Sequence, residues 1–415
     1  MTALTFTLRQ SAHVGDDARG ASVLGTLDHV PGAVVRGALA AAWITRNGEP
    51  RHLPGTQRAE FVALFEGGVR YGPLFAGTPP VPLSVLRHKY PARDDCDDAE
   101  HDEVRGEVGP RCPQCGSPWQ QATRPEAPRE SITRRTSVAI TASGVAARGQ
   151  IVTRDFLRPG LSFAGNLVAD DPALLDTLRG LGPVRVGGRR TTHGLADVGI
   201  GPSSDPPLPE RLPGNRIVLR LSSPAVFVDD DGLPSPEPNV ADLQDVLGVR
   251  VAVRQRWSRW ATVAGWHIAS GLPKPTEIAV AAGSTYLLET AAEVTDDALR
   301  ILTRRGVGLR RHEGFGDLGG PYRLQAGRKA RHREAERLRD LVNQVAALRG
   351  IRTKQSLWPM VLDQLDAHAA GDPGATGFLK KMAADPLYRT ALTRFLSFPP
   401  ADARAVAQEL RKGSS

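Results

Sequence analysis

The sequence predicts an α+β protein in which a β-α-β-β-α-β arrangement occurs twice. Apolar residues alternate with polar ones in residues 2–9, as in a strand with one buried face, and a second such strand is expected at 215–221. A Pro-Gly turn opens a helix over 33–43, and a further helix covers 295–305. Each half ends in a helix, a strand and a basic loop rich in glycine. The two halves therefore look like two versions of one unit.

The remaining elements of the first half follow in order. A Gly-punctuated loop and a short strand are expected at 64–75, and two or three strands at 137–170. A helix over 171–181 leads to a strand and a Gly-Arg loop within 184–200. Residues 201–214 are rich in Pro and Ser, which indicates a linker.

In the second half, an acidic Pro-rich loop (229–239) separates strands, and 279–288 is expected to be one strand. Further strands are expected near 249–253 and 257–264. From Arg328 onward, apolar residues at helical spacing predict a small bundle. The predicted organisation is an N-terminal domain (1–210), a second domain of the same type (211–327) and a helical C-terminal domain (328–415).

Composition narrows the class of function. The chain has 415 residues, of which 40% are hydrophobic and 5% aromatic, with a net charge of +8. Few aromatics disfavour a carbohydrate or lipid pocket, whereas an arginine-rich surplus suits nucleic acid, although a GC-rich genome gives the same bias. We expect no signal peptide, and no apolar run reaches the roughly 20 residues of a membrane span. A cytoplasmic protein is expected.

Three cysteines predict a structural zinc site in an insertion over 91–130. Cys112 and Cys115 form a C-P-x-C-G knuckle, which suits thiolate ligation, and Cys96 supplies a third ligand. His101 is the best fourth ligand by spacing, with His88 as the alternative. The insertion has little apolar material, so a metal would explain how it folds. The alternative is an insertion with spare thiols.

Residues 306–318 (GVGLRRHEGFGDL) are the most informative segment. Glycines let a backbone approach a phosphate and expose its N–H groups, and arginines add charge and planar donors. The segment is neither a P-loop nor a dinucleotide-binding fingerprint. The simpler alternative is a β-turn with solvated arginines.

The segment and three others resemble the RAMP superfamily of CRISPR-associated proteins. The other three are His29–Leu39 (HVPGAVVRGAL), Tyr71–Phe75 (YGPLF) and the stretch 265–284 with its GLPKP motif. The last is similar to the type III-D, Cas-five-like subunit of the Csx-ten family. The resemblance spans about residues 1–325 and implies paired ferredoxin-like (RRM-like) folds.

The resemblance also implies a role in a multi-subunit type III CRISPR effector used in antiviral defence. Such a subunit is non-catalytic, holds the 5′ handle of the guide RNA (crRNA) and contacts the large subunit beside backbone RAMP subunits, with target RNA as a further candidate partner. RNA-binding residues carried over by the resemblance, or added here by charge and position in the two loops, are Arg36, Arg185, Arg189, Arg190, Gly308, Arg310, Arg311, His312 and Gly314.

A RAMP ribonuclease is the alternative. Cleavage of guide precursor without metal needs a general base, for which the candidates are His13, His29 and His312. Metal-dependent cleavage of target RNA needs a loop carboxylate, for which the candidates are Asp16, Asp17 and Asp28. Asp229–Asp231 are more simply explained as a solvated loop.

A basic cluster at the start of the C-terminal region has no such assignment. Six arginines and lysines crowd residues 328–339, at the end of a helix where the dipole disfavours cations. The cluster therefore indicates a partner, either RNA phosphate or an acidic protein surface.

Overall fold

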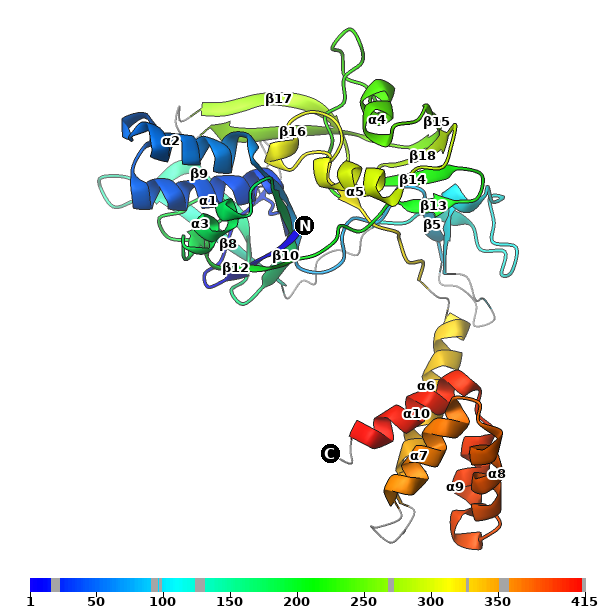
Figure 1. The fold of residues 1–415 in the computed structure, drawn as a ribbon. Coiled ribbons are helices and arrows are strands. Elements are labelled where there is room, and N and C mark those ends of the chain that lie inside the picture. The colour runs from blue at the N-terminus through cyan, green and yellow to red at the C-terminus, as the bar shows by residue number, and fades with distance from the viewer. Residues whose placement is uncertain are drawn as a thin grey trace. The chain divides into compact units, whose positions relative to one another are not determined.

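A computed structural model gives the fold and describes residues 1–15, 23–90, 96, 99–123, 131–267, 272–325, 328–350 and 358–412 (Figure 1). The chain forms two compact units, one of 1–89, 100–112 and 118–324, and one of 90–99, 113–117 and 325–415. All described strands lie in the first unit, and helices α6–α10 lie in the second.

The first large sheet has six strands in the order β11–β12–β1–β10–β4–β3, and its pairings are antiparallel. Its central strand β1 follows the predicted alternation, because Leu4 and Phe6 are fully buried while Thr7 is exposed. The strands are β1 (Thr2–Leu8), β3 (His29–Val30), β4 (Val69–Phe75), β10 (Ser162–Ala169), β11 (Val184–Arg185) and β12 (Leu195–Ser203).

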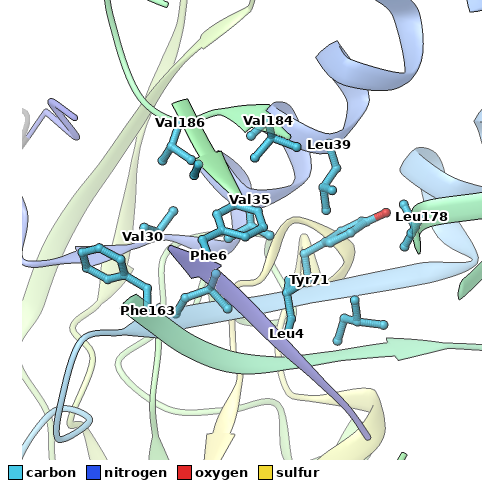
Figure 2. Close-up of a cluster of buried hydrophobic side chains, with 14 of the residues drawn as sticks. Leu4, Phe6, Val30, Val35, Leu39, Tyr71, Phe163, Leu178, Val184 and Val186 are labelled. Carbon is cyan, nitrogen blue, oxygen red and sulfur yellow. The ribbon is translucent and has the colours of Figure 1, made fainter. Parts of the chain in front are cut away.

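Two helices cover the apolar face of this sheet. Helix α1 (Gly32–Asn47) contributes Val35, Leu39 and Trp43, and α3 (Ala173–Arg179) contributes Leu178. Figure 2 shows Val35, Leu39 and Leu178 in the same cluster as Phe6 of β1 and Tyr71 of β4. Helix α2 (Gly55–Val62) and short helical turns at 50–52 and 63–67 connect α1 to β4.

The second large sheet has the order β13–β14–β18–β15, and β19 also pairs with β14. Helices α4 (Val240–Leu247) and α5 (Asp296–Arg305) contribute to its core, and the side chains of Asn239 and Thr295 cap their N-termini. The strands are β13 (Glu210–Leu212), β14 (Arg216–Leu221), β15 (Val251–Trp257), β18 (Thr285–Thr290) and β19 (Leu318–Gly319).

A buried ion pair joins the two sheet regions. Arg70 on β4 donates to Asp317 at 2.6 Å and to the carbonyl of Thr303 at 2.9 Å. Asp317 also accepts from Ser222, at 2.7 Å, directly after β14. Because Arg70 is only 8% exposed, this network fixes β4 against the segment that ends the second half.

Two hairpins extend the sheets. The first pairs β8 (Ile132–Ile140) with β9 (Ala146–Leu157), and the short strand β2 (Val23–Leu24) adds to β9. The second pairs β16 (Trp260–His267) with β17 (Leu272–Val280).

Strands β6 and β7 of the insertion pair with β5, which precedes the insertion, in a small sheet of the order β6–β5–β7. The apolar residue Val104 of the insertion packs against Val218 of β14, so β14 is covered on both faces. On the same side, Arg220 of β14 donates to Asp102 at 2.7 Å, and both side chains are at most 4% exposed. The strands are β5 (Val85–His88), β6 (Glu100–Asp102) and β7 (Trp119–Gln121).

The C-terminal helices share an apolar core of their own. Helices α8 and α9 both begin with proline after an aspartate, and the carboxylates of Asp372 and Asp385 accept from the first backbone N–H groups. In the described part of the chain, no helix is long and apolar enough to cross a membrane. The helices are α6 (Arg328–Arg349), α7 (Trp358–Ala369), α8 (Pro373–Met382), α9 (Pro386–Leu396) and α10 (Pro400–Lys412).

The mixed α/β architecture with C-terminal helices is confirmed, but two local predictions are wrong. Residues 279–288 are not one strand, because a turn with Gly283 at φ 86° separates β17 from β18. The region 201–214 is not only a linker, since it contains the end of β12 and all of β13. Its prolines suggested irregular structure, but strand pairing prevails at its two ends.

Candidate nucleic-acid interface

The Gly-Arg loop of the first half (residues 186–194) connects β11 to β12. Gly187 has φ 77°, and a Cβ atom there would lie 2.2 Å from the carbonyl of His13. The N–H of Gly188 donates to that same carbonyl at 2.9 Å. Glycine is therefore required for the loop to fold against the segment that follows β1.

Cations gather at this loop without carboxylate partners. Arg135 of β8 lies 3.4 Å from Nε2 of His193 and 5.5 Å from the ring centre of Phe156. Arg185 donates to the amide oxygen of Gln10 at 3.1 Å and to the carbonyl of His193 at 3.3 Å. In the described part of the chain, no ion pair neutralises Arg135, Arg185, Arg189 or Arg190.

The electrostatics of His193 follow from this arrangement. Burial lowers the pKa of His193, and the neighbouring guanidinium groups of Arg135 and Arg189 lower it further. Repulsion among these groups remains uncompensated within the described residues. An oxyanion such as a phosphodiester would relieve it, so the loop is suited to bind phosphate.

The arginines of the terminal loop (residues 306–318) have carboxylate partners. Arg310 pairs with Glu277 at 2.6 Å and with Glu313 at 2.9 Å, and it lies over the ring of Phe315. Lys274 binds the same Glu313 carboxylate at 2.8 Å. Burial alone would raise the pKa of Glu313, but the bonds from Arg310 and Lys274 outweigh it and lower the pKa to about 2.

Arg311 and His312 are half-buried. Arg311 lies 3.8 Å from Asp242, and burial together with nearby Arg305 lowers its pKa. Burial also lowers the pKa of His312, followed by the charge of Arg36. A neutral imidazole is a weaker phosphate contact than a charged one, so His312 adds little charge to a phosphate site.

The glycines of the terminal loop are explained by contacts within the chain. Gly314 has φ 87°, and a Cβ atom there would lie 2.2 Å from the carbonyl of Tyr71 and 2.7 Å from the α-carbon of Gly32. Gly308 has φ 76°, and a Cβ atom there would lie 2.6 Å from the carbonyl oxygen of Val226. The loop is thus seated on the start of α1 and on β4.

Arg36 also has partners within the chain. Its Nη2 donates to Glu66 at 2.8 Å, and its Nε donates to the carbonyl of Phe65. These bonds tie α1 to the segment before β4, and the side chain is 18% exposed.

The cysteine cluster differs from the prediction in one ligand. Cys96, Cys112 and Cys115 are brought together as expected, but the fourth member is His88, and the four ligand atoms lie within 4.8 Å of one another. His101 is on β6, and its Nε2 lies 2.8 Å from the carbonyl of Gly106. The spacing argument was wrong because strand pairing, rather than distance along the chain, decides which histidine reaches the thiols.

This donor set fits a metal ion. Three thiol groups and one imidazole are a common structural set for zinc, with bonds of about 2.0–2.3 Å. Cys96 and Cys112 are at most 2% exposed. The ring of His88 stacks on Trp119 at 4.4 Å, which orients the imidazole.

The described candidates for ribonuclease chemistry make contacts within the chain. His13 Nδ1 lies 2.9 Å from the carbonyl of Asp155, and His29 pairs with Asp28 at 3.2 Å. Asp229 accepts from the backbone N–H groups of residues 231 and 233, as in a loop that holds its own shape. Asp16 and Asp17 lie outside the described residues.

Sequence reasoning missed Arg135 and His193 as members of the first-half site. Arg135 lies far from the loop in sequence, and only the pairing of β8 with β9 brings it beside Phe156 and His193. The available signal was an arginine pair within an otherwise Thr-, Ser- and Val-rich strand, RRTSV.

Comparison with known proteins agrees with the resemblance at the level of the superfamily. Residues 131–318, less than half of the chain, match the family model described as CRISPR-associated protein (Cas_Cmr3). The match supports a relation to the RAMP proteins of type III CRISPR systems, and the type III-D subtype stays a prediction. No curated protein matches the chain.

Several solved structures are similar to the chain. One is a chain of the Type III-B Cmr-beta complex bound to cognate target RNA, with 11% identity, a TM-score of 0.43, and coverage of 78% of this chain and 98% of that one. Another is a chain of the Csm3–Csm4 subcomplex of the type III-A interference complex, with 11% identity, a TM-score of 0.33, and coverage of 72% and 96%. TM-scores below 0.5 do not establish a shared fold.

Proposed function

We propose that this chain is a non-catalytic RNA-binding subunit of a type III CRISPR effector complex that holds the 5′ handle of the guide RNA and contacts the large subunit. The observation that carries the proposal is the group of unneutralised cations around the Gly-Arg loop of the first half. The match of residues 131–318 to a CRISPR-associated family supports the choice of RNA as the anion. We expect such a subunit to work in the cytoplasm.

The strand orders support a second part of the proposal, that each half of the chain is a ferredoxin-like unit. In the first half, β1, β4, β10 and β12 are the first to fourth strands, and β1 lies between the fourth and the third (β12–β1–β10–β4). In the second half, β14, β15, β18 and β19 take these places, because β14 pairs with both β19 and β18, and β15 follows β18. In the first half α1 and α2 follow the first of these strands and α3 follows the third, and in the second half α4 follows the first and α5 the third. We therefore interpret both halves as ferredoxin-like units.

We propose different parts for the predicted RNA-binding residues. Arg185, Arg189 and Arg190, together with Arg135 and His193, form the primary phosphate site. The terminal loop would contribute less, because the charge of Arg310 is balanced within the protein and the N–H groups of Gly314 and Gly316 donate to carbonyls of the chain. Arg36, Arg311 and His312 would make secondary contacts.

Neighbouring arginines on β8 provide a matched test. Arg134 is paired with Asp155 at 2.7 Å, whereas Arg135 has no carboxylate partner among the described residues. The affinity of the purified chain for a labelled guide RNA with its repeat-derived 5′ segment should be measured against salt concentration. R135Q/R189Q is expected to lower affinity roughly fivefold per lost contact at about 0.1 M salt and to flatten the salt slope by about 0.7 per contact.

The control R134Q is expected to bind as the unaltered chain does. Equal losses in R134Q and R135Q/R189Q would contradict a defined site, and equal affinity for a scrambled 5′ segment would contradict recognition of the handle. Cleavage of the bound RNA by the purified chain would favour a RAMP ribonuclease instead.

We further propose that His88, Cys96, Cys112 and Cys115 hold a structural zinc ion. The ion would give the insertion the stability that its few apolar residues cannot supply. Metal analysis of the purified chain should find about one zinc per chain. H88A is expected to lose it, and the control H101A is expected to keep it. Retention of zinc in H88A and its loss in H101A would show instead that His101 is the fourth ligand, as its spacing from the cysteines suggested.

A further inference from the structure

The C-terminal helices hold nearly all of the net charge of the protein. Residues 325–415 contain 16 Lys and Arg against 9 Asp and Glu, a net charge of +7, whereas residues 1–324 contain 37 against 36. A surplus of this size on 91 residues creates a field that attracts polyanions.

The carboxylates of these helices are already engaged. Asp372 and Asp385 cap helices α8 and α9. Six others pair with arginine or lysine: Glu334 and Asp402 with Arg337, Asp340 with Arg394, Asp363 and Asp366 with Arg411, and Glu409 with Lys412. Exposed cations that form no ion pair within the described residues remain on these helices, among them Lys380, Lys381 and Arg389.

Two of these cations line a groove between α8 and α9. The groove has a volume of about 460 Å³, and its lining residues include no carboxylate: they are Lys380, Ala383, Ala384, Arg389, Thr393, Leu396 and Ser397. Lys380 and Arg389 are exposed, and neither forms an ion pair within the described residues.

Helix geometry aligns the polar groups on one wall of this groove. Arg389, Thr393 and Ser397 are spaced by four residues, so they follow one another along one face of α9 and its C-cap, about one turn apart. Arg389 donates to the carbonyl of Ala384 at 3.0 Å, which holds its guanidinium beside the end of α8. The hydroxyl of Ser397 donates to the carbonyl of Arg394. The hydroxyl of Thr393 is therefore the one that could donate to a ligand.

We propose that the α8–α9 groove binds the sugar-phosphate backbone of single-stranded RNA and gives the protein a second RNA contact, separate from the Gly-Arg loop. The choice of RNA rests on the proposed function. It also rests on composition, because lysine is depleted from protein–protein interfaces, whereas Lys380 and its neighbour Lys381 are both exposed here. A backbone contact of this kind would be independent of sequence.

The test uses the full chain and a labelled single-stranded RNA of mixed sequence. K380Q/R389Q is compared with R411Q/K412Q, which removes the same two kinds of charge from residues that pair with carboxylates in the same group of helices. K380Q/R389Q is expected to weaken binding about 25-fold at about 0.1 M salt and to flatten the salt slope by about 1.4, whereas the control changes neither by more than about twofold.

Four outcomes separate the possibilities. Equal losses in the two double variants would show an effect of net charge alone and would overturn the groove. Binding unchanged by K380Q/R389Q but lost in R135Q/R189Q would overturn the groove and leave the proposed function intact. The reverse pattern would support the groove and count against the loop. Binding of labelled polyglutamate that is as strong as RNA binding and is lost in K380Q/R389Q would replace RNA with an acidic protein surface.

Chemical protection gives a second measurement that does not depend on the folding of a variant. RNA should slow the acetylation of Lys380 in the unaltered chain and leave that of Lys412 unchanged. Equal rates at Lys380 with and without RNA would overturn the proposal.

Discussion

The two glycine-rich basic loops have similar sequences and different surroundings. Around residues 186–194, Arg135, Arg185 and His193 lie together without a carboxylate among the described residues. Around residues 306–318, Arg310 is bound by Glu277 and Glu313. The comparison shows that a Gly-Arg pattern predicts a sharply folded basic loop, whereas the neighbouring acids decide whether its charge is available to a ligand.

Breaking the packing of the terminal loop should have the largest effect. Gly314→Ala is expected to lower the free energy of unfolding by roughly 4 kcal/mol, because left-handed strain of about 1–2 kcal/mol adds to overpacking of about 1–3 kcal/mol. Gly214→Ala is the control, since Gly214 has φ 80° with open space around it, and it should lose only about 1–2 kcal/mol. Denaturant titration measures both, and equal losses would mean that the contact with Tyr71 and Gly32 is unimportant.

Removing the carboxylate of the terminal loop should come next. Glu313→Gln is expected to cost about 3 kcal/mol at neutral pH, the value of lowering its pKa from 4.5 to about 2. Because the folded-state pKa is depressed, this stability is present above the unfolded pKa and is lost as pH falls toward 2. Unfolding curves for the unaltered chain and E313Q should therefore converge in acid.

The exposed pair of Glu289 with Arg254 is the control for that experiment, and E289Q should change stability little. If the difference in the free energy of unfolding between the unaltered chain and E313Q stays the same at low pH, then the substitution removes packing rather than charge. RNA affinity should change much less in E313Q than in R135Q/R189Q.

The smallest expected effect is a pH dependence of RNA binding at the first loop. Burial lowers the pKa of His193, the charges of Arg135 and Arg189 lower it further, and a bound phosphate would favour its charged form. Affinity should therefore rise as pH falls from about 7.5 to about 5.5. His193→Gln should remove that rise and His312→Gln should keep it, as measured by RNA titration at each pH. A rise that survives in H193Q would assign the proton to another group.

Much of the fold was predictable from local patterns. Alternation in β1, the start of α1 and the caps of α5 depend on residues close in sequence, and these elements are observed. The broken strand at 279–288 was not predicted, because the left-handed turn at Gly283 is set by its close approach to the carbonyl of Val81. Contacts between distant segments leave no local signal.

In the candidate sites too, residues with a local sequence signal were predicted, and those set by contacts between distant segments were not. The three cysteines were predicted from thiol chemistry and spacing, while the choice of His88 depends on the pairing of β5 with β7. The loop arginines were predicted from charge, but the pairing of Arg310 with Glu277 could not be, since that acid belongs to β17. Availability of charge is a property of tertiary structure.

The buried pair of Asp102 and Arg220 has a consequence for synthesis and for engineering. The two residues are 118 positions apart, so at about 5–20 residues per second the ribosome makes Asp102 roughly 6–24 s before its partner. During that interval β14 has not been synthesised, so Val104 and Asp102 of the insertion lack the residues that they contact in the folded protein. A gene split at residues 201–214 would put the two residues on separate polypeptides, and the face of β14 that carries Val218 and Arg220 would then lack the cover of the insertion. The two halves should therefore be expressed as one polypeptide, despite their similar strand orders.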